Sequence, residues 1–166
     1  MTATIGSALT AKTIQHITAA NGVNSNLAAL IQAGQASIAL LTPAQVSSQN
    51  APAELIERSA IMQYPALHVY CEKITNSQIE KYRSFSGTAQ MTIEVRHSQD
   101  RLEGLQDTVE RYAGAVTQTL DRSRGDWGGG TYYAGGYQVT FGAAKHGGKN
   151  FTQVAKVTFE IGVSIN

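Results

Sequence analysis

The stretch GTAQMTIEVRHSQDRLEGLQDTVERYAGAV, residues 87–116, changes its hydrophobic period in the middle. In its first part, every second residue from Ala89 to Val95 is apolar, which is the period of a strand buried on one face. From residue 98 to residue 123 the apolar side chains are instead three and four apart, which is typical of an amphipathic helix. The stretch therefore predicts one strand followed directly by one long helix.

The predicted helix has an N-terminal cap and one apolar stripe. Asp100 and Glu103 have the spacing of a capping box, and the opposite face carries charged residues that are free for water or a neighbour. Gly104 falls inside this helix, where glycine costs about 1 kcal/mol relative to alanine. Close approach of another backbone to the exposed face of the helix would explain this glycine, and so would tolerance of a mildly unfavourable residue. The apolar stripe consists of Leu102, Leu105, Val109, Tyr112, Ala113, Val116 and Leu120.

Three further stretches alternate with a period of two. One starts just after Pro65, and residues 137–143 and 156–165 flank the turn-forming sequence AKHGGKN, which predicts a hairpin with a basic tip. The order strand, strand, helix, strand, strand predicts an α+β fold. We expect an antiparallel sheet of about four strands with the long helix packed on one face, plus N-terminal helices.

Residues 1–62 are rich in Ala, Gln, Ser, Thr and Asn and poor in aromatic residues. A chain of 166 residues fits one domain, so we expect this segment to pack on, or to extend from, a core formed by residues 63–166. Its predicted elements are a helix over 7–20, a shorter helix over 26–32, a candidate strand over 36–42 that is too short to be unambiguous, and a loop over 43–54.

Composition excludes several classes of protein. The net charge of +1 gives no overall signal for nucleic acid, although residues 1–121 hold eight basic against ten acidic residues and residues 122–166 hold five against two. Cys71 is the only cysteine, which excludes an intrachain disulfide and a multi-thiolate zinc site and fits a reducing compartment. The N-terminus lacks the pattern of a signal peptide and no stretch reaches membrane-spanning length, so we expect a soluble protein.

No motif predicts a reaction centre. Residues 124–137 contain an Arg-Gly-Asp triplet and a glycine cluster, but nothing predicts export, and a phosphate loop needs a helix directly after its glycines, where a strand follows here. The sequence GGKN at 147–150 is not a phosphate loop for the same reason, because a predicted strand follows it. Cys71 lies mid-strand, where a thiol usually acts as a small hydrophobe. We therefore predict no catalytic, cofactor-binding or metal-binding residue and no enzyme activity. The histidines, which lack metal-ligand spacing, are His16, His68, His97 and His146.

Aromatic and basic residues gather in two C-terminal segments, the glycine-rich stretch and the hairpin tip. Aromatic side chains and arginines dominate protein contacts, and the same set would also stack on single-stranded bases and pair with phosphates. For the tryptophan alone, covering the edge of its own core is the more ordinary role. The candidate interaction residues are Arg122, Arg124, Trp127, Tyr132, Tyr133, Lys145, His146 and Lys149.

This arrangement resembles the tail terminator, or tail completion, proteins of long-tailed bacteriophages. The resemblance covers residues 64 to the C-terminus, and residues 1–62 depart from the family pattern. It is carried by YPALHVY at 64–70, SGTAQMTIEVRHS at 86–98, the helix over 100–122 with its VERYAGAV core, GGTYYAGGYQV at 129–139 and AKVTFEIGVSI at 155–165.

The resemblance implies a structural virion protein at the tail neck, assembled in the bacterial cytoplasm. Such proteins form a ring, usually a hexamer, that ends the tail tube and joins it to head-completion proteins, and DNA passes through the lumen without being read. The implied partners are further copies of the chain, the tail tube protein, a head-completion or neck protein and, as a candidate, the tail sheath. The basic hairpin tip would face the DNA channel or the next ring. A head-closure or other neck connector protein is the alternative.

Overall fold

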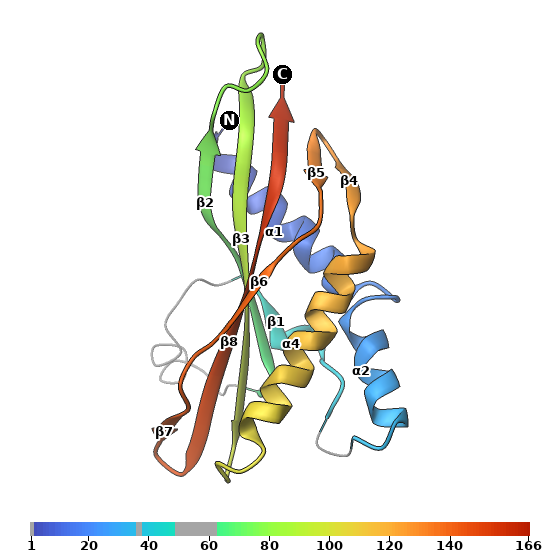
Figure 1. Ribbon diagram of the computed structural model, residues 1–166, viewed down its shortest axis with the longest axis vertical. Helices are drawn as coiled ribbons and strands as arrows, with labels where there is room; N and C mark the ends of the chain where they lie inside the picture. The colour runs from blue at the N-terminus through green and yellow to red at the C-terminus, as the bar shows by residue number, and fades with distance from the viewer. Residues whose placement is uncertain (1, 36–37, 49–62) are drawn as a thin grey trace.

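The computed structural model describes residues 2–35, 38–48 and 63–166, and the body is elongated (Figure 1). The helices are α1 (Thr2–Thr18), α2 (Val23–Gln32) and α4 (Leu105–Arg122), with a short 3-10 helix η1 (Pro43–Gln45). The strands are β1 (Val46–Ser47), β2 (Ala66–Asn76), β3 (Phe85–Gln99), β4 (Gly125–Gly128), β5 (Thr131–Tyr133), β6 (Gln138–Phe141), β7 (Lys145–Gly147) and β8 (Asn150–Ile165).

The eight strands form one mixed sheet that curls into a half-barrel. Its strand order is β1-β2-β3-β8-β5-β4, and β6 and β7 also pair with β8. The β1–β2 pair is parallel and the others are antiparallel. The central β3–β8 ribbon is continuous, because Phe85 pairs with Ile165 at one end and Gln99 with Phe151 at the other.

The predicted antiparallel sheet of about four strands is therefore wrong. One strand was expected between the glycine-rich stretch and the hairpin tip, but three short strands, β5, β6 and β7, share that side of β8. Gly135 and Gly136 have φ values of 96° and 88°, which interrupt a strand between β5 and β6. A parallel strand, β1, and the β4–β5 hairpin also lie where the sequence predicted loop.

The helices pack around one apolar core. Helix α4 packs on β3 and β8, and α1 packs on β2 and β3. Helix α2 packs on α4 and is fixed there by Asn26, whose buried amide donates to the carbonyl oxygen of Ala115 (2.9 Å) and to Thr119 Oγ1 (3.1 Å). The N-terminal helices thus contribute to the same core as the sheet.

The start of α4 differs from the prediction. The helix begins at Leu105, with Gly104 as its N-cap residue at φ 75°, and no side chain caps it. Asp100 is not the cap, and Leu102 leaves the apolar stripe with 55% of its surface exposed. Only glycine adopts this left-handed conformation without steric cost, which explains Gly104 by backbone geometry and not by a neighbouring chain.

Of the elements predicted for residues 1–62, the two helices are present and the shorter elements differ. The two predicted helices are present, but α1 begins at Thr2 and α2 at Val23. Residues 38–42 form neither strand nor helix, and residues 43–47 form η1 and β1 instead of a loop. Residues 36–37 and 49–54 of these predictions lie outside the described part of the chain.

Candidate functional site

The glycine cluster forms a tight turn against the central ribbon. Gly128, Gly129 and Gly130 all have positive φ, between 63° and 78°, which glycine adopts freely. A Cβ atom on Gly130 would lie 1.9 Å from the carbonyl oxygen of Ser164, so the turn is pressed against β8. These glycines shape the β4–β5 hairpin and present no helix N-terminus to a phosphate.

Trp127 turns inward from this hairpin. Its Nε1 donates to the carbonyl oxygen of Ser123 (2.6 Å), and its ring centroid lies 4.4 Å from that of His16 and 5.6 Å from that of Tyr133. Tyr133 is fully buried, and burial raises its pKa to about 12. The side chain of Tyr133 is therefore a core residue and not the contact residue that was predicted, and half-buried Trp127 covers the edge of that core.

The exposed predicted residues near α4 surround a small hollow. A space of about 220 Å³ lies between the C-terminal ends of α1 and α4 and is lined by Asn21, Arg122, Arg124 and Trp127. Arg124 pairs with Asp121 (3.1 Å), and both side chains are largely exposed. Two arginines and a tryptophan line this hollow, and these residue types are enriched where proteins contact one another.

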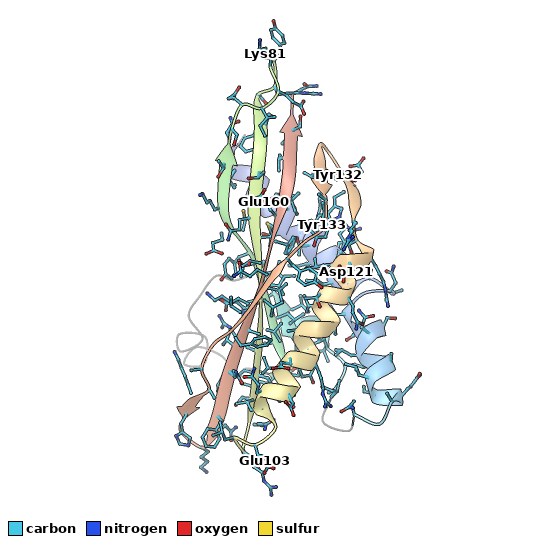
Figure 2. All side chains as sticks on the ribbon, viewed as in Figure 1. Lys81, Glu103, Asp121, Tyr132, Tyr133 and Glu160 are labelled. Atoms are coloured by element: carbon cyan, nitrogen blue, oxygen red, sulfur yellow. The ribbon has the colours of Figure 1, made fainter. Side chains whose placement is uncertain are left out.

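Tyr132 points away from the core beside Tyr133, because the two residues are neighbours on one strand (Figure 2). It is 56% exposed. The β4–β5 hairpin therefore presents Tyr132 alone as a free aromatic side chain, while Tyr133 anchors the hairpin to the core.

The predicted basic tip lies at the other end of the ribbon (Figure 1). Lys145, His146 and Lys149 are exposed on and beside β7, where Lys145 pairs in register with Thr152 and His146 with Phe151. The ring centroid of His146 lies 4.9 Å from that of Phe151. The eight predicted residues therefore do not form one patch: three lie at this tip, and the other five gather around the C-terminal end of α4 and the β4–β5 hairpin.

A polar cluster, His68, Tyr70, Glu94, Arg96 and Lys156, occupies the face of the sheet opposite α4. Glu94 Oε1 accepts from Tyr70 Oη (2.8 Å) and lies 3.4 Å from Lys156 Nζ, while Glu94 Oε2 accepts from Arg96 Nε (3.0 Å). Burial favours the neutral acid, but the bonds from Arg96 and Tyr70 outweigh it and hold the pKa of Glu94 below its usual value. Alternation alone predicted the polar side of β3, but it did not predict that this side is buried.

Ser47 lies beside this cluster, and together with His68 it has the residue types of a nucleophile and its base. Ser47 Oγ lies 2.9 Å from His68 Nδ1, and His68 Nε2 has no hydrogen-bond partner among the described residues. Burial, and then the charge of Arg96, lower the pKa of His68 to about 4. A general base works best with a pKa near the working pH, so this pair is better suited to structure than to catalysis.

The low pKa of His68 predicts acid sensitivity. An unfolded chain takes up this proton near pH 6.5 and the folded chain only near pH 4, so we expect stability to fall by roughly 2–3 kcal/mol as the pH drops through that window. Urea unfolding at a series of pH values measures it. His68→Asn keeps a donor and acceptor near Ser47 but no titration, so its stability curve should be flatter. His16 and His97, whose pKa values burial also lowers, and at the acid end Glu94, whose pKa is lowered by Arg96 and Tyr70, contribute to the remaining slope. Identical slopes for both proteins would contradict the prediction.

Sequence reasoning missed an exposed loop between β2 and β3, residues 77–84, here called the apical loop. Ile79 is 71% exposed and Tyr82 is 100% exposed. Tyr82 has φ 67° and Gln78 φ 49°, a left-handed conformation that costs about 1–2 kcal/mol for each such residue. Two large apolar residues within the polar run NSQIEKYRS were the available signal. Strain of this kind gathers at functional sites.

A groove of about 650 Å³ was also missed; it lies between α1 and β2. It forms where a bulge between Cys71 and Lys73 shifts the register of β2 against β3, and where Gly6 of α1 approaches Cys71 closely. Its lining combines apolar, hydroxyl and charged residues: Gly6, Ser7, Thr10, Ala11, Ile14, Ser48, Cys71, Glu72, Lys73 and Ile74. The carboxylate of Glu72 accepts from Thr92 Oγ1 (2.8 Å).

Among residues 2–35, 38–48 and 63–166, no cluster of three His, Cys, Asp or Glu residues has the geometry to hold a metal ion. Within the same ranges, no helix combines the length and apolar content needed to cross a membrane. No protein-family model matches the chain, and no curated protein matches its sequence.

Proposed function

We propose that this chain is a structural protein of a bacteriophage virion that forms a homo-oligomeric ring, a hexamer, at the end of the tail tube. There it stops tube growth and joins the tube to a head-completion or neck protein. DNA passes through its lumen without being read. The proposal rests on the resemblance of residues 64–166 to tail terminator proteins.

The structural feature that supports it best is the separation of exposed surfaces along one rigid ribbon. Lys81 marks the apical loop at one end of the molecule, and the basic tip on β7 lies at the other (Figures 1 and 2). The continuous β3–β8 pairing joins the two ends. A ring subunit between two other assemblies needs contact surfaces that face in different directions, and heterologous contacts between copies close such subunits into rings.

Single-stranded nucleic-acid binding has less support. Stacking on bases needs exposed aromatic faces beside positive charge. Trp127 and Tyr133 instead pack on each other and on Phe159, with ring centroids 5.4–6.3 Å apart. Tyr132 (56% exposed) and Tyr137 (40% exposed) are the exposed aromatic residues of residues 122–141 apart from Phe141, and Tyr137 Oη donates to Asp121, the ion-pair partner of Arg124. Two tyrosines, one of them engaged by Asp121, are a small platform for a strand.

Deletion of the gene tests the proposal. We expect phages that lack this protein to build overlong tails, because nothing ends polymerisation of the tube, and expression of the wild-type chain should restore normal length. Electron microscopy of tails in lysates measures both. Normal tails with heads that leak DNA would instead identify a head-closure or neck connector protein, and normal infectious particles would contradict both roles.

A further inference from the structure

The ring of His16 covers part of the Trp127 indole. The two ring centroids lie 4.4 Å apart, and the ring planes are tilted by 36°. Trp127 is held from other sides as well, because its rings pack on Tyr133 and Phe159 and its Nε1 donates to the carbonyl oxygen of Ser123 (2.6 Å). Of the two partners in this contact, His16 is therefore the one that can move.

The contact borders the hollow between the C-terminal ends of α1 and α4. His16 and Trp127 both line this space of about 220 Å³. His16 lies in the last turn of α1 and is half-buried. Rotation about its side-chain bonds carries the imidazole off the indole and toward water, while the backbone of α1 stays in place. The contact can therefore open without unpacking the core.

Lys12 is a fixed positive charge next to His16. It lies one helical turn before His16 on α1, and its ammonium donates to the carbonyl oxygen of Gly128 and to Thr131 Oγ1 (2.9 Å) of the β4–β5 hairpin. These bonds keep Lys12 in place when His16 gains a proton. Like charges four residues apart on a helix repel each other, so a charged His16 is unfavourable where the neutral ring packs.

The other elements around the hollow contribute charges of both signs. Arg122 ends α4, and Asp126 lies on β4. The charge of Arg124 is offset by its ion pair with Asp121 (3.1 Å). Tyr133, behind the indole, stays neutral because burial raises its pKa to about 12. The charged groups around His16 are therefore three basic and two acidic residues: Lys12, Arg122, Arg124, Asp121 and Asp126.

The packed position of His16 disfavours a proton. Burial, and then the charge of Lys12, lower the pKa of His16 below its ordinary value of 6.5. Attraction between a cation and the indole, and the C-terminal end of α1, both favour an imidazolium, but the lowered pKa means that burial and Lys12 outweigh them. A His16 that faces water keeps the ordinary value, so as the pH falls below 6.5 the proton stabilises the outward position relative to the packed one.

We propose that His16 is a pH-sensitive cover on Trp127. The neutral imidazole packs on the indole, and the imidazolium swings out to water and leaves that part of the indole open. The uncovered ring then lies with Arg122 and Arg124 in the lining of the hollow, and these residue types are enriched where proteins contact one another. The cover belongs to the single chain, so it goes beyond the tail role and does not depend on it.

The fluorescence of Trp127, the only tryptophan, reports the cover directly. From about pH 7.5 to about pH 5, on either side of the ordinary histidine pKa, we expect its emission to shift to longer wavelength and acrylamide to quench it more strongly. The midpoint of both changes should lie below pH 6.5. Constant emission and constant quenching over this range would overturn the proposal. Dimmer emission with unchanged access to acrylamide would also overturn it, because the imidazolium would then have stayed on the indole.

Two variants of His16 assign the response to this side chain. His16→Phe keeps a ring against Trp127 but takes up no proton, and His16→Gln has neither the ring nor the proton. We expect no pH response of Trp127 in either variant over this range. His146→Gln is the matched control, because His146 is exposed at the other end of the ribbon, and it should respond like the wild type. A wild-type response in either His16 variant would overturn the proposal.

Far-ultraviolet circular dichroism separates opening of the cover from unfolding. We expect the spectrum to stay constant over the same pH range, since the cover opens by rotation of one side chain. A loss of circular dichroism with the same midpoint as the emission shift would overturn the proposal, because Trp127 would then report loss of the fold. Tail length in the deletion strain is an independent measurement, so the tail role and the cover can fail separately.

Discussion

Replacing Arg96 with methionine should lower the free energy of unfolding by about 3–5 kcal/mol. Arg96 and Glu94 are almost fully buried, and Arg96 Nε donates to Glu94 Oε2 at 3.0 Å. Without the guanidinium, the partners that Glu94 keeps among the residues that the structure describes are Tyr70 Oη and the more distant Lys156 Nζ. A buried carboxylate that loses its main counterion is strongly destabilising, whereas methionine itself packs well.

A double-mutant cycle separates the interaction energy between Glu94 and Arg96 from the other effects of each substitution. Glu94→Gln with Arg96→Met should be more stable than Arg96→Met alone, because the uncompensated charge is gone. Lys156→Met is the matched control: the side chain of Lys156 is half exposed, and its removal should cost at most about 1 kcal/mol. Urea unfolding at neutral pH measures five proteins: the wild type, Glu94→Gln, Arg96→Met, the double variant and Lys156→Met. Additive effects of the two substitutions would show that Glu94 does not depend on Arg96.

Replacing Gly130 with alanine should lower the free energy of unfolding by at least about 3 kcal/mol. Gly130 has φ 73°, and a Cβ atom there would lie 1.9 Å from the carbonyl oxygen of Ser164. That oxygen belongs to β8, and Ser164 N donates to the carbonyl oxygen of Gly130 (2.8 Å). The clash is with backbone, so it cannot be relieved by rotating a side chain and must move the β4–β5 hairpin away from β8.

Gly128→Ala is the control for this substitution. Gly128 has a similar φ, 78°, but a Cβ atom there meets nothing within 4 Å. It should cost only the left-handed strain of about 1–2 kcal/mol. Trp127, the only tryptophan, lies beside both positions, so its fluorescence should change in Gly130→Ala and not in Gly128→Ala. Equal losses of stability in Gly130→Ala and Gly128→Ala would mean that left-handed backbone strain, and not the clash with Ser164, causes the loss in Gly130→Ala.

Sequence periodicity predicted the residues that make the core, although it did not predict the sheet. Met91, Ile93 and Val95 lie on one buried face of β3, and Val109, Val116 and Leu120 are buried on α4. These positions follow from local geometry, since side chains of a strand alternate and those of a helix repeat every 3.6 residues. The outward Leu102 shows the limit, because its place depended on where α4 begins.

The candidate site was predicted less well. Residue type drew attention to Trp127 and Tyr133, but whether an aromatic ring faces a partner or its own core depends on contacts with His16 and Phe159, far away in the sequence. The apical loop and the groove were missed for the same reason. Their shape and exposure follow from contacts that exist only after β2, β3 and β8 have paired.

By itself the sequence determined the approximate places of β2, β3, β8 and most of α4, and which side of each is apolar, because those properties depend on neighbours a few residues away. Only the tertiary structure decided that β3 and β8 pair along their whole length, that β5, β6 and β7 share one side of β8, and that Glu94 and Arg96 are buried together. These features depend on long-range pairing and on the curl of the sheet, and hydrophobic period carries no information about either.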